Sequence, residues 1–146
     1  MEQNPTLSSL LCFDIYSANL AFGRLYKPLL DPLGLTYPQY LALVLLWERD
    51  GQSVSEIGGS LGLESSTLTP LLKRLETAGL LRRLRDNEDE RRVRIFLTDQ
   101  GRDLQTKAAG VAECVAKATG LGADEAVAMQ TALIRLRSAL ETAQTS

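Results

Sequence analysis

The spacing of apolar residues predicts a chain built mostly of helices. Between Leu7 and about Leu30, apolar residues are too frequent for a helix with only one face on a core. A helix that is apolar most of the way round is buried on several sides, as at a subunit interface. Pro28 should bend or end this helix, and residues 31–34 (Asp-Pro-Leu-Gly) predict a turn. Thr36 is then a candidate N-cap for a second apolar helix that ends near Trp47.

Two helices separated by a glycine turn come next. Ser53 and Glu56 have the spacing of a capping box, which predicts a short helix to about Leu61, and Gly62 then turns the chain. The following helix should run from about Ser65 to Ala78. Its apolar stripe consists of Leu68, Leu71, Leu72 and Leu75. A short helix, a tight turn and a helix that begins with small hydroxyl residues form the layout of a helix-turn-helix.

A charged segment between two short apolar runs predicts a β-hairpin. The runs are residues 80–84 and 93–97, and the turn between them is acidic and then basic. A hairpin that directly follows a helix-turn-helix forms a wing. The sequence therefore predicts a winged helix-turn-helix at residues 36–98, with its wing at about residues 80–97.

The rest of the chain predicts two further helices. One begins at Thr98 and reaches about Ala118, with an interruption at Gly110, and residues 119–122 break the pattern. A last amphipathic helix covers Asp124 to about Ala143. Its inward positions should be Val127, Leu133, Leu136 and Leu140.

These alanine-rich helices carry little that recognises a ligand, so we expect them to pair with residues 7–30 of this or another subunit. The sequence thus predicts one domain over residues 1–146, in which residues 7–35 and 99–143 supply the dimerisation helices.

Composition narrows the class of protein. No apolar run approaches the roughly 20 residues of a membrane span, and the N-terminus does not resemble a secretory signal, so we expect a cytoplasmic protein without a membrane partner. Two cysteines are too few for a disulfide framework and are expected as free thiols or a redox pair. The absence of histidine excludes histidine acid-base catalysis and histidine metal sites. The chain is therefore expected to be no enzyme and to need no cofactor or metal.

Positive charge is concentrated in one stretch. Residues 73–94 carry eight of the 16 Lys and Arg residues of a chain whose net charge is −2. A basic segment on an otherwise acidic body predicts a surface that binds a polyanion, and its place in a winged helix-turn-helix predicts that the polyanion is DNA.

The expected DNA contacts fall into two groups. The helix from Ser65 should present base-reading hydroxyls and two phosphate- or guanine-binding cations, namely Ser65, Ser66, Thr67, Thr69, Lys73 and Arg74. The wing should supply arginines for phosphates and the minor groove, namely Arg82, Arg83, Arg85, Arg91, Arg92 and Arg94, with Asp89 as the acid that orients Arg91. Taken alone, the hydroxyls are better explained as helix caps, and the arginines can be a solvated charged hairpin. The order of helix-turn-helix, wing and clustered charge favours DNA binding.

Several segments resemble the MarR transcription regulators. The resemblance to the family core rests on residues 66–76, on Gly79-Leu80 and on Asp89-Glu90-Arg91. Residues 24–30 and 33–41 resemble one branch, the organic hydroperoxide resistance repressors (OhrR). The likeness covers about Leu10 to Arg102. It implies a homodimer that binds pseudo-palindromic double-stranded operator DNA.

Cys12 should lie on the first helix, one turn from Tyr16 and on the same face. Tyr26 is fourteen residues further along, which in a helix is about 21 Å, beyond the reach of a tyrosine. A contact between Tyr26 and Cys12 would therefore need the partner subunit, with Tyr37 joining from the following turn. A lone cysteine on an apolar helix is usually an inert core residue. The resemblance to OhrR instead implies that Cys12 is the peroxide sensor and that Tyr26, Tyr37 and Tyr16 stabilise its thiolate.

The resemblance also implies a redox cycle. An organic hydroperoxide would oxidise Cys12 to a sulfenic acid, which a second thiol would convert to a disulfide. Cys114 resembles the resolving cysteine of the two-cysteine members, and a small cellular thiol is the alternative. Oxidation would then release DNA. Two rival interpretations stay open: a MarR-type repressor released by a small aromatic or acidic ligand, with both cysteines incidental, and a thiol peroxidase.

Overall fold

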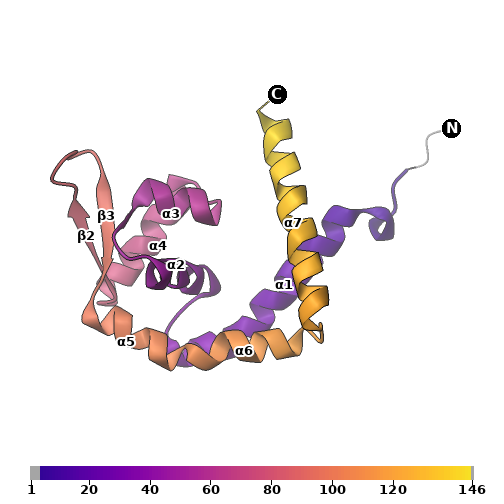
Figure 1. Ribbon diagram of the computed structural model, residues 1–146, viewed down its shortest axis with the longest axis horizontal. Coiled ribbons are helices and arrows are strands. Elements are labelled where there is room, and N and C mark those ends of the chain that lie inside the picture. Colours follow the sequence, from indigo (N-terminus) through magenta and orange to yellow (C-terminus); the bar gives the residue numbers. More distant parts are fainter. Residues whose placement is uncertain (1–3, 146) are drawn as a thin grey trace. The chain divides into compact units, whose positions relative to one another are not determined.

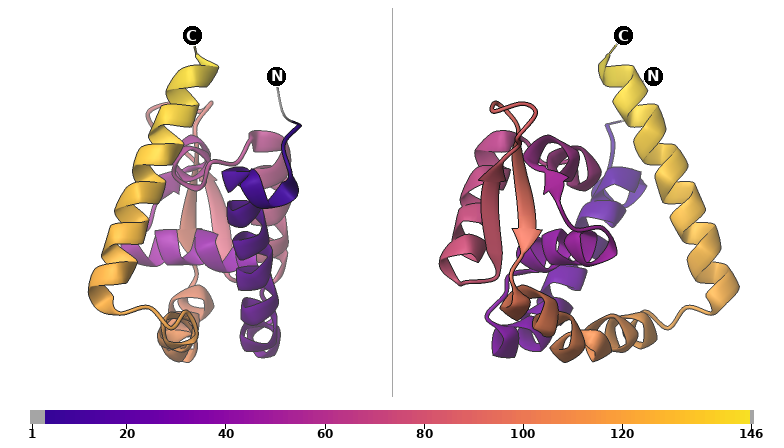
Figure 2. Two further views of the ribbon diagram at one scale, coloured as in Figure 1. Left: turned by 90° about the vertical axis from the view of Figure 1, so that its right-hand side faces the viewer. Right: turned by 60° about the vertical axis from the view of Figure 1, so that its left-hand side comes forward.

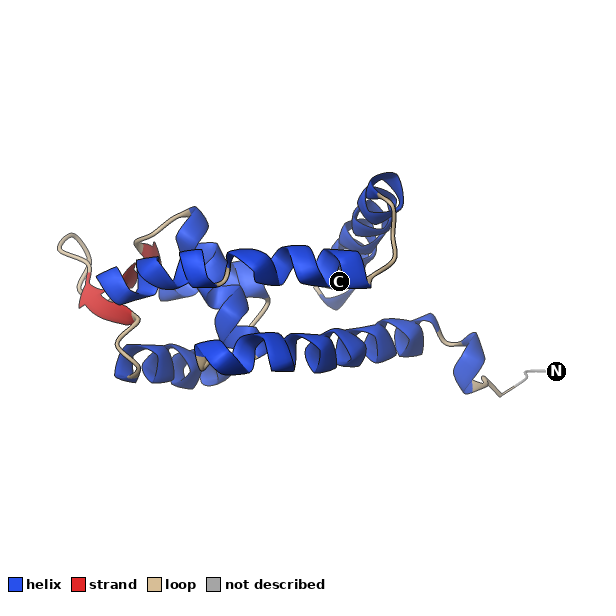
Figure 3. Ribbon diagram, turned by 90° about the horizontal axis from the view of Figure 1, so that it is seen from below, coloured by secondary structure: helices blue, strands red, loops and turns tan. Residues whose placement is uncertain are grey.

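The computed structural model describes residues 4–145 and confirms a mostly helical chain with a small antiparallel sheet (Figures 1 and 3). Its elements in chain order are η1 (Leu7–Ser9), α1 (Leu11–Leu30), η2 (Asp31–Leu33), α2 (Tyr37–Glu48), β1 (Gln52–Ser53), α3 (Val54–Leu61), α4 (Ser65–Thr77), β2 (Leu81–Arg85), β3 (Val93–Leu97), α5 (Asp99–Lys107), α6 (Ala109–Ala118) and α7 (Ala123–Gln144). The chain forms two compact units, one up to Val111 and the other from Ala112 onward.

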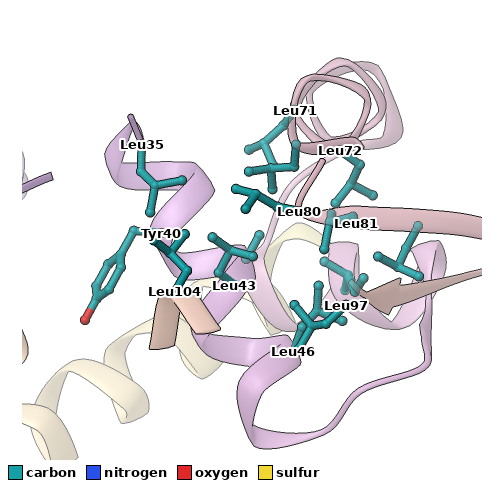
Figure 4. Close-up of a cluster of buried hydrophobic side chains, with 14 of the residues drawn as sticks. Leu35, Tyr40, Leu43, Leu46, Leu71, Leu72, Leu80, Leu81, Leu97 and Leu104 are labelled. Carbon is teal, nitrogen blue, oxygen red and sulfur yellow. The ribbon is translucent and has the colours of Figure 1, made fainter. Parts of the chain in front are cut away.

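The core of the first unit lies between α2, α3, α4 and the sheet. Leu43 and Leu46 of α2 lie close to Leu97 of β3 in this cluster (Figure 4). The predicted stripe of α4 is confirmed, since all four of its leucines are buried. Each fully buried leucine contributes roughly 1.5–3 kcal/mol relative to an exposed one. This packing holds α4 and the hairpin in one body.

The predicted helix starts are formed by side-chain caps. The Thr36 hydroxyl accepts a hydrogen bond from the backbone N–H of Gln39 (3.3 Å), and Ser53 does the same for Glu56 (3.1 Å). Gly62 ends α3 with a φ of 68°, in the left-handed region that glycine adopts without strain. The turn between α3 and α4 is thus specified by local sequence.

The sheet has three strands in the order β1-β3-β2, all antiparallel. The predicted hairpin is confirmed as β2 and β3, which stand at the left of Figure 1 with the wing turn above them. Strand β1 was not predicted, because two residues show no alternation of apolar and polar positions. Its pairing of Gln52 with Ile95 and of Ser53 with Arg94 attaches the base of the wing to the start of α3.

The first helix differs from the prediction at its beginning. Residues 7–9 form a separate 3-10 turn, and α1 begins at Leu11. Pro28 lies in the last turn of α1, which ends at Leu30. Only this C-terminal end packs on the core, and the apolar residues of the first three turns are largely exposed.

The C-terminal helices begin and end close to the predicted residues. The break between α5 and α6 falls at Ala108, slightly ahead of Gly110. The expectation that α7 buries an apolar stripe is not met in the single chain, since none of its described residues is buried. Val127 is 61% and Leu140 54% exposed. Pairing of these helices with a second subunit therefore stays a prediction (Figure 2 shows α7 from two further sides).

Within residues 4–145, no single helix is long and apolar enough to cross a membrane. The segment Leu11–Leu33 and α2 satisfy length and composition only as a pair, and the two are bent by 71°.

Candidate nucleic-acid interface and cysteine site

Helix α4 has one buried and one exposed face. Its leucines point into the core, whereas Ser65, Ser66, Thr67 and Thr69 are exposed. The N-cap of α4 is Glu64, which forms no side-chain cap, and none of the four hydroxyls hydrogen-bonds to a described residue. Capping therefore does not account for this cluster. The helix presents small groups, each able to donate and accept, at the end that meets base edges in helix-turn-helix proteins.

The cations of α4 differ in surroundings from Arg83 of the wing. Lys73 and Arg74 are exposed. Arg83 is half-buried: its Nε donates to Glu76 Oε1 of α4 at 3.0 Å, and its backbone N–H donates to the other oxygen at 3.2 Å. One carboxylate thus fixes strand β2 against α4. Arg83 therefore lies at the predicted DNA-binding surface, with its guanidinium already paired with Glu76.

The tip of the wing carries exposed arginines. The predicted pair of Asp89 and Arg91 is formed only loosely, since Arg91 Nε lies 3.9 Å from Asp89 Oδ1 and the Arg91 side chain is 96% exposed. Arg92 is also exposed, as is Arg82 nearer the base of β2, and Arg85 donates to the carbonyl of Glu90 at 2.8 Å. These guanidinium groups extend into solvent and can reach a phosphate.

A tighter ion pair, not predicted from the sequence, joins Asp86 and Arg94. Arg94 Nε donates to Asp86 Oδ2 at 3.0 Å, and its Nη1 donates to the carbonyl of Gly51 at 2.9 Å. The other carboxylate oxygen accepts the backbone N–H of Glu88 at 2.9 Å. The Glu88 N–H, followed by the Arg94 guanidinium, holds the pKa of Asp86 below its usual value. Arg94, expected among the DNA contacts, is thus bonded within the protein.

Helices α3 and α4 and the wing border one hollow of about 510 Å³. Its lining includes Thr69 of α4, Val54 and Ser55 of α3, and Arg83, Arg91 and Arg92 of the hairpin. The structure therefore brings a predicted hydroxyl residue of α4 and predicted arginines of the hairpin to one concave surface. A concave surface with excess positive charge suits a polyanion backbone.

Trp47 near the end of α2 and Asp50 just beyond that helix make long-range contacts with β3 and α5, and sequence reasoning missed both. Asp50 Oδ1 accepts the backbone N–H of Leu97 at 2.9 Å, and Oδ2 accepts from Arg102 at 3.1 Å. The indole N–H of Trp47 donates to the carbonyl of Gly101 at 2.9 Å. Because these partners are about fifty positions apart in the chain, no local pattern indicates the contacts.

The tyrosines form a cluster at the junction of α1 and α2. The rings of Tyr26 and Tyr37 are stacked with centroids 4.4 Å apart, and Tyr40 lies 5.6 Å from Tyr26. Burial, and then the neighbouring rings of Tyr37 and Tyr40, raise the pKa of Tyr26 to about 12. Burial likewise raises the pKa of Tyr37. Both phenols therefore stay protonated near neutral pH and can donate a hydrogen bond.

Cys12 lies at the opposite end of α1 from this cluster. Cys12 and Tyr26 belong to one continuous helix, so about 21 Å of helix separates them. Within one chain the two residues do not meet. Cys12 and Tyr16 are both exposed on the part of α1 that leaves the core.

Cys114 is an exposed free thiol on α6. Among the residues that the structure describes, no group of three or more Cys, Asp or Glu side chains is arranged to hold a metal ion. The chemistry available at these positions is that of thiols and phenols.

Comparison with known proteins shows similarity to transcriptional regulators. The model of the MarR family matches residues 35–93. The chain is 53% identical over 139 residues to the HTH-type transcriptional regulator TtmR of Methylorubrum extorquens (strain PA1), which covers 95% of this chain and 71% of that protein. It is 50% identical over 105 residues to the organic hydroperoxide resistance transcriptional regulator of Bacillus subtilis (strain 168), with 72% and 71% covered.

The fold is similar to that of a solved regulator in two states. Reduced AbfR bound to DNA superposes with a TM-score of 0.78 at 36% identity, over 96% of each chain. Disulfide-formed AbfR superposes with a TM-score of 0.61 at 36% identity, over 96% of this chain and 93% of that one.

Proposed function

The chain belongs to the MarR family of transcriptional regulators, in its organic hydroperoxide resistance branch, and on this premise we propose that it is a redox-controlled repressor. Reduced, it binds operator DNA as a homodimer. Oxidation of Cys12 by an organic hydroperoxide releases the DNA. Its relatives regulate transcription and are not enzymes. A repressor must be in the same compartment as the DNA it binds, so a cytoplasmic location is part of this proposal.

The DNA-binding half of the proposal is supported by α4 and the wing. The exposed hydroxyls of Ser65, Ser66, Thr67 and Thr69 make no hydrogen bond to a described residue, so they are available to base edges in the major groove. Arg91 and Arg92 at the wing extend toward solvent and are available to phosphates. A two-fold dimer presents this surface twice, which matches a pseudo-palindromic operator with half-sites about one helical turn apart.

The single observation that carries the sensing half is the stacked pair Tyr26–Tyr37 at the far end of α1 from Cys12. If two α1 helices pack antiparallel, the Cys12 end of one helix meets the tyrosine end of the other. Two protonated phenols then donate to the sulfur and stabilise its thiolate without adding a charge. Exposed apolar residues on the N-terminal turns of α1, such as Leu11 and Ile15, support such a contact.

The sensing reaction is a two-electron oxidation. The Cys12 thiolate attacks the distal oxygen of the hydroperoxide, the O–O bond breaks, and the alkoxide takes up a proton and leaves as the alcohol. Cys12 becomes a sulfenic acid. A second thiol attacks this sulfur, which forms a disulfide and releases water. Cys114 of the partner subunit is one candidate for the second thiol, and a small cellular thiol is the other.

Release of DNA follows from the geometry of a disulfide. The two Cα atoms must come within roughly 7 Å of each other. If the thiols start further apart in the reduced dimer, bridging them moves the helices that carry the winged domains. Operator half-sites tolerate little change in the spacing of two recognition helices.

The test is a gel shift of the reduced full-length protein on the DNA upstream of its own gene, with and without cumene hydroperoxide. Cys12→Ser should bind DNA as the wild type does and should no longer be released. Release of Cys12→Ser by the peroxide would contradict the proposal and favour the ligand-controlled interpretation. Mass spectrometry of Cys12 and Cys114 identifies the resolving thiol, and Cys114→Ser should stay releasable only if a small thiol is added.

A further inference from the structure

Arg94 connects three parts of the wing region through one guanidinium group. It lies on β3, its Nε donates to Asp86 in the wing turn at 3.0 Å, and its Nη1 donates to the carbonyl of Gly51 before β1 at 2.9 Å. The side chain of Asp86 is only 12% exposed, and that of Arg94 is 34% exposed. Arg91, by contrast, is 96% exposed and loosely paired. Arg94 therefore differs from the wing-tip arginines in burial and in bonding.

The alternation of side chains along the hairpin places Arg94 on the face that is turned away from α4. Arg94 pairs with Leu84 across the strands, and Arg83 pairs with Ile95. Neighbouring residues in a strand point to opposite faces. Since Arg83 bonds Glu76 of α4, the face of Arg83 is turned toward α4 and the face of Arg94 away from it. The guanidinium of Arg94 is thus directed away from the helix that would enter the major groove.

The segment that receives Arg94 is closely packed. Gly51 has a φ of 75°, and a Cβ added there would lie 3.0 Å from the ring of Phe96 on β3. The backbone of Gly51 therefore rests directly on the wing, where its carbonyl accepts from Arg94. The guanidinium of Arg94 thus has one hydrogen-bond partner at the base of the wing, Gly51, and one in the wing turn, Asp86.

We infer that Arg94 is a positioning residue, which fixes the tilt of the wing through Asp86 and Gly51 and contacts no phosphate. The inference rests on the proposed DNA binding and assigns the phosphate contacts of the wing to the exposed arginines, such as Arg91 and Arg92. A phosphate contact requires positive charge. The two hydrogen bonds to Asp86 and Gly51 require, in addition, a guanidinium that donates in two directions. Lysine retains the charge and lacks that geometry, so Arg94→Lys separates the two roles.

The experiment is a gel-shift titration of the reduced full-length protein on the duplex upstream of its own gene, at a series of KCl concentrations. Wild type is compared with Arg94→Lys, with Asp86→Ala and with the double variant. Arg92→Gln is the matched control, because it removes an exposed arginine from the same hairpin. Circular dichroism melting verifies that each variant is folded at the temperature of the titration.

We expect Arg94→Lys to raise the Kd by about tenfold, the loss that one charge-assisted hydrogen bond represents. The slope of log Kd against log salt should not change. Asp86→Ala should also weaken binding, although it removes a negative charge, and the double variant should be no weaker than the weaker single one. Arg92→Gln should reduce the slope by roughly one.

Wild-type affinity in Arg94→Lys, or tighter binding by Asp86→Ala, overturns the inference while the proposed function stands. Failure of the wild-type protein to bind the duplex, or a slope that is unaffected by Arg92→Gln, overturns the proposed DNA surface and the inference with it. The two failures are therefore distinguishable in one data set.

Discussion

The ring of Tyr26 lies against the ring of Tyr37 at a centroid distance of 4.4 Å and an interplanar angle of 16°. Tyr26 belongs to the C-terminal part of α1 and Tyr37 is the first residue of α2, so the stack joins the helix that carries Cys12 to the helix-turn-helix body. A group that binds to the two phenols therefore contacts α1 and α2 at the same time.

Removing the phenolic hydroxyl at Tyr26 should slow the oxidation of Cys12 and leave DNA binding intact. Tyr26→Phe retains the stacked ring and loses one donor to the thiolate. We expect a reaction rate with cumene hydroperoxide that is lower by roughly tenfold, since a hydrogen bond to a charged group contributes about 1.5–3 kcal/mol. Stopped-flow loss of the free Cys12 thiol measures the rate in a Cys114→Ser background.

A mixed dimer shows which subunit supplies the tyrosine. One subunit carries Cys12→Ser and the other Tyr26→Phe, so the only sensor thiol faces an intact partner tyrosine. Because α1 separates Cys12 from Tyr26 by about 21 Å within a chain, this mixed dimer should react at the wild-type rate. A rate as slow as that of the Tyr26→Phe homodimer would rule out donation across the dimer.

Alkaline pH should destabilise the fold through the tyrosine cluster. Burial, and then Tyr37 and Tyr40, raise the pKa of Tyr26 from 10.0 to about 12, so the unfolded chain loses this proton at a lower pH than the folded one. The unfolded state therefore binds fewer protons in that window, and stability is full below pH 10 and falls as the pH rises toward 12. Urea unfolding across this range should show a shallower fall in Tyr26→Phe than in the wild type.

Two helical glycines should respond oppositely to alanine. A Cβ at Gly101 would overlap the carbonyl of Leu80, whereas at Gly110 it would meet nothing within 4 Å. We expect Gly101→Ala to lower the free energy of unfolding by about 1–3 kcal/mol through overpacking. Gly110→Ala should raise it by up to about 1 kcal/mol, because alanine in the first turn of α6 reduces the conformational freedom of the unfolded chain without a clash. Equal effects in chemical denaturation would contradict the close packing at Gly101.

The two carboxylates that contact Arg102 should differ in importance. Asp50 bonds Arg102 at 3.1 Å and the backbone N–H of Leu97 at 2.9 Å, and its side chain is 29% exposed. Asp99 lies 3.5 Å from Arg102 and is 99% exposed. Asp50→Ala should lower the free energy of unfolding by about 1–3 kcal/mol, because it leaves a backbone donor without a partner. Asp99→Ala should change it by less than about 1 kcal/mol, as for other exposed pairs.

Most helices and the wing hairpin were predictable because their signals are local. The capping box of Ser53 and Glu56, the leucine stripe of α4 and the left-handed turn at Gly62 each depend on residues within a few positions of one another. Strand β1 was missed because its two residues are held by pairing with β3, about forty positions later.

The candidate site was predictable in its residue types and less so in its contacts. The sequence indicates which residues are basic, and it does not show that Arg94 is bonded to Asp86 and Gly51 while the side chain of Arg91 is only loosely paired with Asp89. Likewise, Asp50 stands at the end of a helix with no pattern around it, and its partners at Leu97 and Arg102 become neighbours only through the fold. The proximity of Tyr26 and Tyr37 was expected through the resemblance to a family, because no spacing rule predicts a stacked pair.

The carboxylate of Asp50 holds the last residue of β3 and an arginine of α5 at the same time, with Trp47 one turn earlier bonded to α5 as well. Bending at the root of the wing would break several of these hydrogen bonds together, so we expect no hinge there. If the proposed oxidation repositions the DNA-binding surface, we therefore expect α2, the wing and the start of α5 to move together as one unit.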